Sequence, residues 1–490
     1  MIKKSALVLV LIIWCLVTNG QYITPNSGVT WDLDDLVYNS EGAVTLEGNV
    51  YYIHDNLIIS EFDTVRIISD ETIKIFSQKL ITIKGAMQVQ SPEELMISAV
   101  DTMQNYLGFR FENSNASFFE NCTIEFGGGI ELVESDVRFE GCKIRKNNKS
   151  NSTGAIDLFN CNPVIIDCDI FLNEGPAILS PANGGCSPYI SGNWIYRNNT
   201  ANTNMPQVNL GPSDPGTDIQ ILNNVIDGFY DRAGGIAVTT LAGGSVSCII
   251  DGNVIKNNRY GITAYGYDIN TVISNNILAD NNIENLPLQG GSGINFWGGT
   301  SNTSMVVGNE IYGNLWGITN TGNALPNMGQ VEPDTINPGG NIIYNNGNEG
   351  VTYALYNNTP NDIFAENNYW GSYNLDTVAA VIFDYYDDET LGIIDYLPIK
   401  DYVTRVLVVN SHTPVLEIFP NPASNYISIN LPEYAAGIGK VLIFNASGKI
   451  VSEQNVTQTY HLNITSLDAG VYLVYFTNDK ITLTGKFIKQ

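Results

Sequence analysis

Acid–base catalysis needs side chains that exchange protons near neutral pH, and this chain of 490 residues has few of them. It contains three histidines, His54, His412 and His461, and none of them lies in residues 107–371. That range also lacks an Asp-Asp pair. Histidine-based acid–base catalysis and Ser-His-Asp hydrolysis are therefore excluded from residues 107–371.

One chemistry stays open, the calcium-assisted elimination of an acidic sugar polymer. It needs carboxylates that hold Ca²⁺ against a uronate, and a Lys or Arg that takes the proton α to the carboxylate. The candidate catalytic residues are Asp227, Asp231, Lys256 and Arg259. Asp227 and Lys256 hold equivalent positions in successive repeats. They form either a carboxylate–base pair or a plain ion pair on a solvated face, and such ion pairs are the commoner case.

Aromatic and acidic side chains give two further candidate sites. Tyrosines and tryptophans can stack on sugar rings, although they equally favour strands for packing. The residues concerned are Tyr196, Tyr312, Tyr344, Trp194, Trp297 and Trp316. The acidic segment with Asp384, Asp387 and Asp388 is a candidate Ca²⁺ site, but it lacks EF-hand spacing, and solvated acids explain it as well. No Cys-x-x-Cys pair supports a thiolate zinc site.

The overall charge narrows the possible partners. Lys and Arg number 23 against 50 Asp and Glu, a formal net charge of −27. A nucleic acid or an anionic membrane surface is therefore an unsuitable partner, because little is present to neutralise phosphates. Cations or a neutral polymer fit better. The 46 glycines and abundant asparagines favour turns and exclude a helical bundle or helical solenoid.

The elements that position these residues follow from internal repeats. A phrase recurs with a small polar anchor, a branched apolar residue two positions later, and in most copies Asn five positions later. Consecutive anchors are 20 to 33 residues apart. The ten anchors are Cys122, Cys142, Cys168, Asn193, Asn224, Asn253, Asn276, Asn309, Asn341 and Asn368. A second phrase lies between them, from Gly129-Ile130 through Gly235-Ile236 and Gly317-Ile318 to Gly350-Val351.

These units predict the coils of a parallel β-solenoid, because one coil cannot bury its apolar face but stacked coils share a core. The anchor Asn and the Asn five residues later should form two stacked amide ladders. We also expect these asparagines to take the left-handed conformation that a corner needs. The residues three after each anchor form an outward column: Glu125, Arg145, Phe171, Tyr196, Asp227, Lys256, Ala279, Tyr312 and Tyr344.

The sequence pattern also predicts how the chain divides into segments and domains. Residues 1–20 are a predicted signal peptide, with Lys3 and Lys4 before a short apolar run, and no later stretch is long enough for a membrane helix. Residues 21–106 form an N-terminal cap and first coils, and 107–371 the main repeats. Residues 372–408 form a C-terminal cap and linker. Residues 416–490 alternate like strands of a small β-sandwich.

Six cysteines follow the predicted leader, and three of them are anchors. Cys122, Cys142 and Cys168 should point inward and stack within disulfide reach. Because only two of three stacked cysteines can pair, we expect free thiols there.

Two resemblances add to this interpretation. The coil phrases and the closing Asn367-Asn368-Tyr369-Trp370-Gly371 resemble the right-handed parallel β-helix, or pectin-lyase-like, superfamily over residues 44–371. That scaffold hosts lyases, hydrolases, epimerases and adhesins, so the likeness implies a fold and no single function. The last 75 residues resemble the C-terminal sorting domain of the type nine (Por) secretion system. The matching residues are Pro420, Asn421, Pro422, Gly448, Gly470, Tyr472, Lys486 and Lys489.

The second resemblance implies export through the periplasm by the type nine secretion machinery, to the cell surface or the medium. We therefore expect an all-β, exported protein that binds an extracellular glycan or a neighbouring cell without catalysis. The alternative is a calcium-dependent polysaccharide lyase. No cofactor is certain, and Ca²⁺ is the one that the acidic residues allow.

Overall fold

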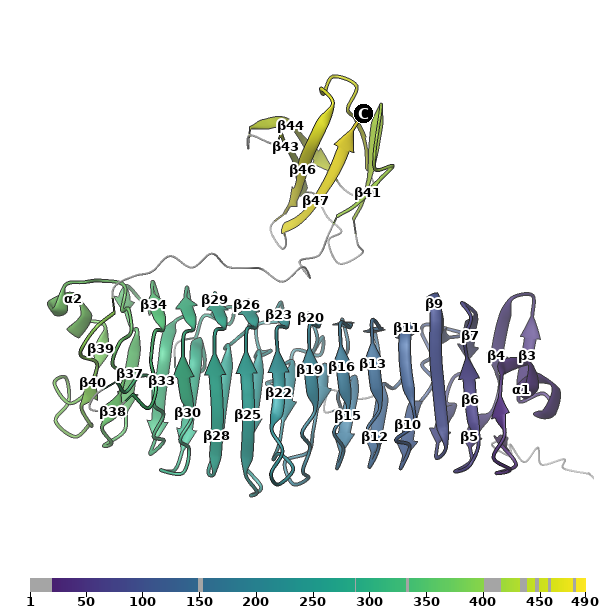
Figure 1. The fold of residues 1–490 in the computed structure, drawn as a ribbon, viewed down its shortest axis with the longest axis horizontal. Coiled ribbons are helices and arrows are strands. Elements are labelled where there is room, and N and C mark those ends of the chain that lie inside the picture. The colour runs from purple at the N-terminus through teal and green to yellow at the C-terminus, as the bar shows by residue number, and fades with distance from the viewer. Residues whose placement is uncertain are drawn as a thin grey trace, which may run out of the picture. The chain divides into compact units, whose positions relative to one another are not determined.

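A computed structural model describes residues 20–490 except 149–152, 287, 332–334, 401–415, 432–438, 446–448, 457–459 and 479–481. Residues 1–19 of the predicted signal peptide, the linker around 409–414 and Gly448 lie outside the described residues. The chain divides between residues 402 and 403 into two compact units (Figure 1). No helix among the described residues is long and apolar enough to cross a membrane.

The first unit is a stack of coils with strands on three faces. The strands of one face form a single 14-stranded parallel sheet, called the first sheet. Its strands are β1 (Gln21–Ile23), β5 (Asn56–Ile59), β8 (Leu80–Ile83), β10 (Gly108–Glu112), β12 (Ile130–Val133), β15 (Ile156–Phe159), β18 (Ile178–Leu179), β21 (Val208–Leu210), β24 (Ile236–Thr239), β27 (Ile262–Gly266), β30 (Ser292–Gly298), β33 (Trp316–Gly322), β37 (Leu355–Asn358) and β39 (Ile382–Phe383).

The other two faces are joined where β9 (Ala86–Ala99) and β11 (Phe118–Glu125) run through the corner between them. The second sheet also contains β2 (Thr30–Trp31), β6 (Thr64–Ile67), β13 (Arg138–Glu140), β16 (Val164–Ile166), β19 (Tyr189–Ser191), β22 (Ile219–Leu222), β25 (Val246–Asp251), β28 (Ile269–Ser274) and β31 (Met305–Val307). The third sheet also contains β3 (Val44–Glu47), β4 (Val50–Ile53), β7 (Thr72–Ile75), β14 (Lys143–Arg145), β17 (Asp169–Phe171), β20 (Trp194–Tyr196), β23 (Val225–Asp227), β26 (Val254–Lys256), β29 (Ile277–Ala279), β32 (Glu310–Tyr312) and β34 (Ile342–Tyr344).

The predicted repeat is confirmed by the strand register. Equivalent residues of successive coils pair in parallel, as in Ile226↔Ile255 and Ile255↔Leu278 on the third sheet. Their side chains alternate between a buried apolar core and the surface, and Ile255 is fully buried. The second phrase aligns on the first sheet with one exception. Leu355 takes the core position expected for Val351, which lies exposed in the antiparallel hairpin of β35 (Gly347–Asn348) and β36 (Val351–Thr352).

Both predicted amide ladders are present. In the anchor ladder each side-chain oxygen from Asn224 onward accepts from the backbone N–H and the side-chain Nδ2 of the asparagine one coil earlier, at 2.8–3.0 Å. The ladder members are Asn193, Asn224, Asn253, Asn276, Asn309, Asn341 and Asn368. These amides are buried and also donate to backbone carbonyls inside the coils. They thereby give hydrogen-bond partners to buried carbonyl groups that would otherwise have none.

The prediction that the ladder asparagines take the left-handed conformation is wrong, because that conformation occurs one residue earlier. The residue before each anchor has the positive φ, for example Asn223 (55°), Gly252 (69°) and Asn275 (53°). The corner is therefore made one position earlier, and the ladder asparagine keeps its side chain directed inward.

Both ends of the coil stack are covered. At the start lie α1 (Leu33–Asn39), with a capping box between Asp32 and Asp35, and the antiparallel hairpin of β3 and β4. At the other end lie α2 (Leu375–Ala379) and the short parallel pair of β38 (Ile363–Phe364) and β40 (Ile394–Asp395). Such caps hide strand edges that would otherwise pair with another chain.

The second unit consists of two antiparallel sheets with their own core. One sheet contains β41 (Glu417–Phe419), β42 (Tyr426–Asn430) and β45 (Tyr460–Asn463). The other contains β43 (Gly439–Asn445), β44 (Ile450–Val456), β46 (Gly470–Thr477) and β47 (Thr482–Lys489). The core contains Ile427, Val441, Val474 and Phe487, and it shares no residue with the core of the first unit.

Candidate functional site

The outward column of the third sheet has the predicted register. Asp227 pairs with Lys256 across β23 and β26, and their charged groups are 3.3 Å apart. Asn257 also donates to the Asp227 carboxylate at 2.8 Å. Both charged groups are therefore already partnered, as expected of a cross-coil ion pair on the surface.

The other two candidate catalytic residues have partners of their own. Arg259 is 8% exposed and donates to Glu284, to Asn204 and, at 2.7 Å, to the carbonyl of Gln289. Asp231 accepts from Asn202. The contacts of the described residues join Asp227 to Lys256 but join neither to Arg259 or Asp231. A guanidinium held by three partners in the folded protein is poorly placed to act as a base.

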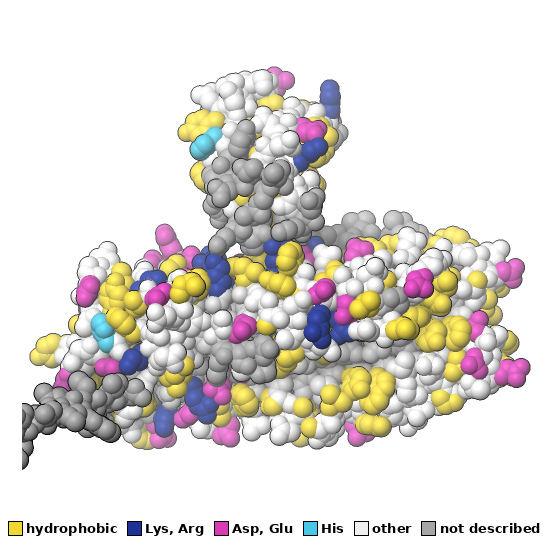
Figure 2. All heavy atoms as spheres, turned by 180° about the vertical axis from the view of Figure 1, so that it is seen from behind, with side chains coloured by type: hydrophobic (Ala, Val, Ile, Leu, Met, Phe, Trp, Pro, Cys, Tyr) yellow, Lys and Arg dark blue, Asp and Glu magenta, His cyan; other side chains and the backbone are white. Residues whose placement is uncertain are grey.

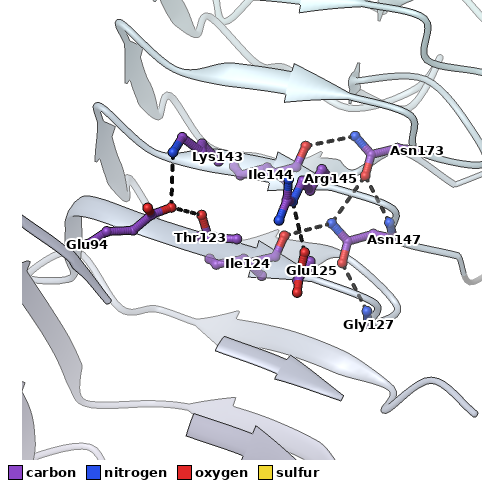
Figure 3. A network of polar contacts seen from close by, with 10 residues as sticks. All are labelled: Glu94, Thr123, Ile124, Glu125, Gly127, Lys143, Ile144, Arg145, Asn147 and Asn173. Atoms are coloured by element: carbon purple, nitrogen blue, oxygen red, sulfur yellow. Dashed lines mark hydrogen bonds and ion pairs between the residues drawn. The ribbon is translucent and has the colours of Figure 1, made fainter. Parts of the chain in front are cut away.

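At its N-terminal end, this column and the outward residues beside it form a network of acids and cations (Figure 3). Arg145 donates to Glu125 at 2.8 Å, while Glu94 accepts from Thr123 and, at 3.1 Å, from Lys143. Burial opposes ionisation of Glu94, but the hydrogen bonds from Thr123 and Lys143 outweigh it and lower the pKa of Glu94. Glu94 therefore stays ionised near neutral pH and has no proton to donate as a general acid. Sequence reasoning missed Glu94 because its strand precedes the first anchor.

The three candidate tyrosines lie in the same column but differ in access. Tyr196 is 2% exposed, and its ring stacks on Trp194 and Phe171 at 3.6 and 4.6 Å between centroids, so it offers no face to a sugar. Tyr312 and Tyr344 are half-buried and stack on each other at 5.2 Å. The Tyr344 hydroxyl also donates to Glu310. A charged neighbour and a partnered hydroxyl make this pair a poor sugar platform.

The acidic candidates for Ca²⁺ use their oxygens locally. The buried Asp384 carboxylate accepts from the backbone N–H groups of Tyr386 and Ile394 at 3.0 and 2.9 Å. Asp387 and Asp388 likewise accept from backbone N–H groups of this turn. Across the described part of the chain no group of three or more His, Cys, Asp or Glu side chains could hold a metal ion.

A cluster of aromatic side chains lies on the outer face of the first sheet, between β27 and β39. We call it the aromatic platform. It consists of two ring stacks, Trp297 on Tyr265 and Tyr356 on Phe383, and a strip of polar side chains beside them. The polar side chains are Thr263, Ser292, Asn295 and Thr319. In the first stack Trp297 lies on Tyr265 at 4.2 Å between centroids, with 10° between the planes. In the second, Tyr356 lies on Phe383 at 4.6 Å and 16°. Trp316 packs against the second stack, 5.0 Å from Tyr356.

The strand register explains why the two stacks are separate. Trp297 of β30 pairs with Thr321 of β33, and Tyr356 of β37 pairs with Thr319 of the same β33. One coil with threonines at its outward positions therefore lies between the coil that carries Trp297 and the coil that carries Tyr356. Of these small hydroxyl side chains, Thr319 is buried and Thr321 is half-buried.

In the polar strip, uncharged side chains of successive coils are joined by hydrogen bonds. Asn295 donates to Thr263 at 2.8 Å, and Thr319 donates to Asn295 at 2.8 Å. The Ser292 and Thr319 hydroxyls are 2.9 Å apart. Asn295 has a second N–H group, and the hydroxyl oxygens can each accept more than one hydrogen bond.

None of the residues that define the platform is charged. Within the platform, burial, followed by the nearby Tyr353 and Asp388, raises the pKa of Tyr356. Figure 2 shows hydrophobic side chains gathered in patches along one side of the β-helix, with charged side chains scattered between them. Sequence reasoning singled out Trp297 and Trp316 but could not pair them with Tyr265 and Tyr356, since loops of variable length separate these strands.

The second unit brings its separated motif residues together. Asn421 donates to the carbonyl of Lys486 at 3.1 Å and accepts from the N–H of Ile488 at 3.0 Å, which ties the Pro420-Asn421-Pro422 segment to the last strand. Gly470 pairs with Lys489 across β46 and β47. The Tyr472 ring stacks on Phe487, and its hydroxyl donates to the carbonyl of Asp468 at 2.9 Å.

Comparison with known proteins matches two families. Residues 81–276 match a family described as the right handed beta helix region, and residues 417–490 match the secretion system C-terminal sorting domain. No curated protein matches the chain.

Solved structures similar to this chain include a mutant of the periplasmic alginate epimerase AlgG, at 14% identity and a TM-score of 0.43. The match covers 76% of this chain and 82% of the epimerase chain. A mutant tailspike protein of E. coli bacteriophage HK620, in complex with a pentasaccharide, is similar at 9% identity and a TM-score of 0.42. It covers 90% of this chain and 85% of the tailspike chain. At such identities these likenesses carry no conclusion about activity.

Parallel coils, internal ladders and a C-terminal sandwich agree with the two family matches. The chain is a right-handed parallel β-helix protein whose C-terminal sorting domain directs its export by type nine secretion to the cell surface or the extracellular space.

Proposed function

We propose that the exported protein binds an uncharged extracellular glycan on the aromatic platform, without cleaving it. The observation that carries this proposal is the pairing of two ring stacks with an uncharged hydroxyl–amide strip. Ring faces and edges pack against the C–H groups of sugars, and Ser, Thr and Asn side chains exchange hydrogen bonds with sugar hydroxyls.

The charge of the chain supports a neutral ligand over an acidic one. At −27, the protein repels polyanions such as pectate or alginate, unless cations lie between them. The platform itself offers no Lys or Arg to hold a carboxylate, whereas its aromatic and hydroxyl groups need no charged partner.

Binding of the full chain to soluble glycans tests the proposal. Titration calorimetry should detect at least one neutral polysaccharide among β-glucans, xylans and mannans, and weaker or no binding of pectate and alginate. Trp297→Ala and Tyr356→Ala should each weaken binding by about tenfold, since tenfold corresponds to about 1.4 kcal/mol, the size of one lost ring contact.

The matched control is Tyr344→Ala, which removes a half-buried stacked tyrosine from the third sheet. It should leave glycan affinity unchanged. An equal loss in this variant would show that the platform is not the binding site. Calcium-dependent formation of unsaturated products from pectate or alginate, abolished by Lys256→Ala, would instead support the lyase alternative.

A further inference from the structure

We propose that two pairs of stacked cysteines, Cys122 with Cys142 and Cys161 with Cys186, become disulfides that join successive coils in the exported protein. The proposal concerns a covalent modification of the β-helix and is independent of glycan binding. It replaces the expectation from sequence that the anchor thiols stay free.

The strand register places the members of each pair one coil apart. Thr123 pairs with Lys143, so the preceding residues Cys122 and Cys142 are stacked neighbours. Cys161 and Cys186 each lie three residues before a pair of aligned residues, Val164 and Tyr189. Neighbouring coils lie about 4.8 Å apart, which is within the range of Cα separations that disulfides span.

The side chains of the first pair already touch. The sulfur atoms of Cys122 and Cys142 are 3.5 Å apart. For the second pair the strand register places Cys186 one coil after Cys161, and the Cys161 thiol donates to the carbonyl of Leu132 at 3.6 Å. All four residues are at most 1% exposed, so all four thiols lie inside the stack. A disulfide then needs side-chain rotation and no rearrangement of strands.

The other two cysteines serve as internal references. Cys248 aligns with Ile219 on one side and Thr271 on the other, so no cysteine is stacked on it. Cys168 is stacked on Cys142, but Cys142 can form only one disulfide. The Cys142 sulfur lies 3.5 Å from that of Cys122, while the Cys168 thiol donates to the carbonyl of Ile166 at 3.2 Å.

The oxidation balances through exchange with a disulfide of a thiol–disulfide oxidoreductase or of oxidised glutathione. One cysteine thiolate attacks the donor disulfide, forms a mixed disulfide and releases one donor thiol. The second cysteine thiolate attacks the mixed disulfide, which forms the inter-coil bond and releases the second donor thiol. The two cysteine protons pass to the released thiolates. Because the pairs are buried once the coils stack, exchange takes place during folding after export, where disulfides persist.

Thiol trapping of the full chain tests the proposal. Protein collected from the medium or the cell surface is denatured with iodoacetamide, without reductant, and its peptides are identified by mass spectrometry. We expect linked peptides for Cys122–Cys142 and Cys161–Cys186, and alkylated Cys168 and Cys248. Six alkylated cysteines, or a Cys142–Cys168 link, would overturn the proposal.

Single substitutions give a second readout that does not depend on detecting linked peptides. Cys161→Ser should expose the Cys186 thiol and raise the alkylated cysteines from two to three. The control Cys248→Ser should lower them from two to one. Refolding of reduced full-length protein with oxidised glutathione should restore both links. Alkylation of Cys186 in the unsubstituted, refolded protein would contradict the second pair.

Discussion

One buried carboxylate fastens the start of the described chain to the coil stack. Asp63 is 1% exposed and accepts from the backbone N–H groups of Asn26, Ser27, Gly28 and Val29 at 2.8–3.2 Å. Burial opposes its ionisation, yet the hydrogen bonds outweigh burial and lower the pKa of Asp63 below its usual value. The native contacts therefore favour the ionised form.

The lowered pKa predicts a stability loss in acid. A carboxyl whose pKa is lower in the folded state stabilises the fold above its unfolded pKa, about 4, and loses this contribution as pH falls through the folded pKa. Hydrogen exchange of residues 24–29 should stay slow between pH 7 and 5 and accelerate below about pH 4, after correction for intrinsic rates. Asp63→Asn should exchange fast at all these pH values, and exposed Asp395→Asn should behave like the unsubstituted protein.

Corner residues also make a prediction at the scale of single residues. Gly252, with φ of 69°, precedes the ladder residue Asn253, and asparagines hold the same position as Asn223 and Asn275 in neighbouring coils. Gly252→Ala should lower the free energy of unfolding by about 1–2 kcal/mol, because a Cβ disfavours this region. Gly252→Asn should cost less, since asparagine tolerates a positive φ. Equal urea midpoints for the two variants would contradict this account.

At the scale of elements, the second amide ladder contains an unexpected member. The coil of Asn224 lacks an asparagine five residues later, and Gln207 fills the gap from another part of the chain. Its side-chain oxygen accepts from Asn198 at 3.2 Å, and its Nε2 donates to Asn258 at 3.1 Å and to the carbonyl of Asp227 at 3.1 Å. Gln207 thus keeps the ladder continuous over a coil that would break it.

Shortening this side chain tests its role. Gln207→Asn lacks the methylene that lets the amide reach both neighbours, so at least one buried polar group loses its partner, at a cost of about 1–3 kcal/mol. The urea midpoint of the first unit should fall accordingly. Exposed Asn270→Gln, on β28, should change the midpoint little. A midpoint for Gln207→Asn within error of the unsubstituted protein would show that the ladder tolerates a gap.

Repeats made the coils, the anchor ladder and the outward column of the third sheet predictable, because the anchors and the strands that follow them keep one spacing in every coil. The exceptions have physical causes. Gln207 is invisible to a search for asparagine, and Val351 is displaced by a hairpin that the Gly-Val phrase does not reveal. The aromatic platform depends on which strands of the first sheet are neighbours across loops of variable length, so Trp297 could be noticed but its stacking on Tyr265 could not.

At the scale of the whole molecule, charged and uncharged surface residues occupy different parts of the first sheet. Near its start, Arg110 bonds to Glu112 and, at 2.8 Å, to Glu131, whereas the later coils carry the uncharged aromatic platform. The ends of the stack are capped, and the coil core and the core of the second unit share no residue. The two units therefore have separate sources of stability.

This separation predicts the outcome of removing residues 416–490. The truncated chain should unfold with the same urea midpoint as the first unit of the full chain, since no core residue of the β-helix is lost. It should also accumulate in the periplasm instead of reaching the surface or the medium, because the sorting domain carries the export signal. Immunoblots of periplasm, cell surface and medium, beside a urea titration of the purified protein, measure both effects.

Asn421→Ala is a milder variant for comparison with the truncation, because it removes only the two hydrogen bonds that tie the Pro420–Pro422 segment to the last strand. A truncated protein that reaches the medium at the normal level would contradict the role of this domain, and a lowered midpoint would contradict the independence of the two cores.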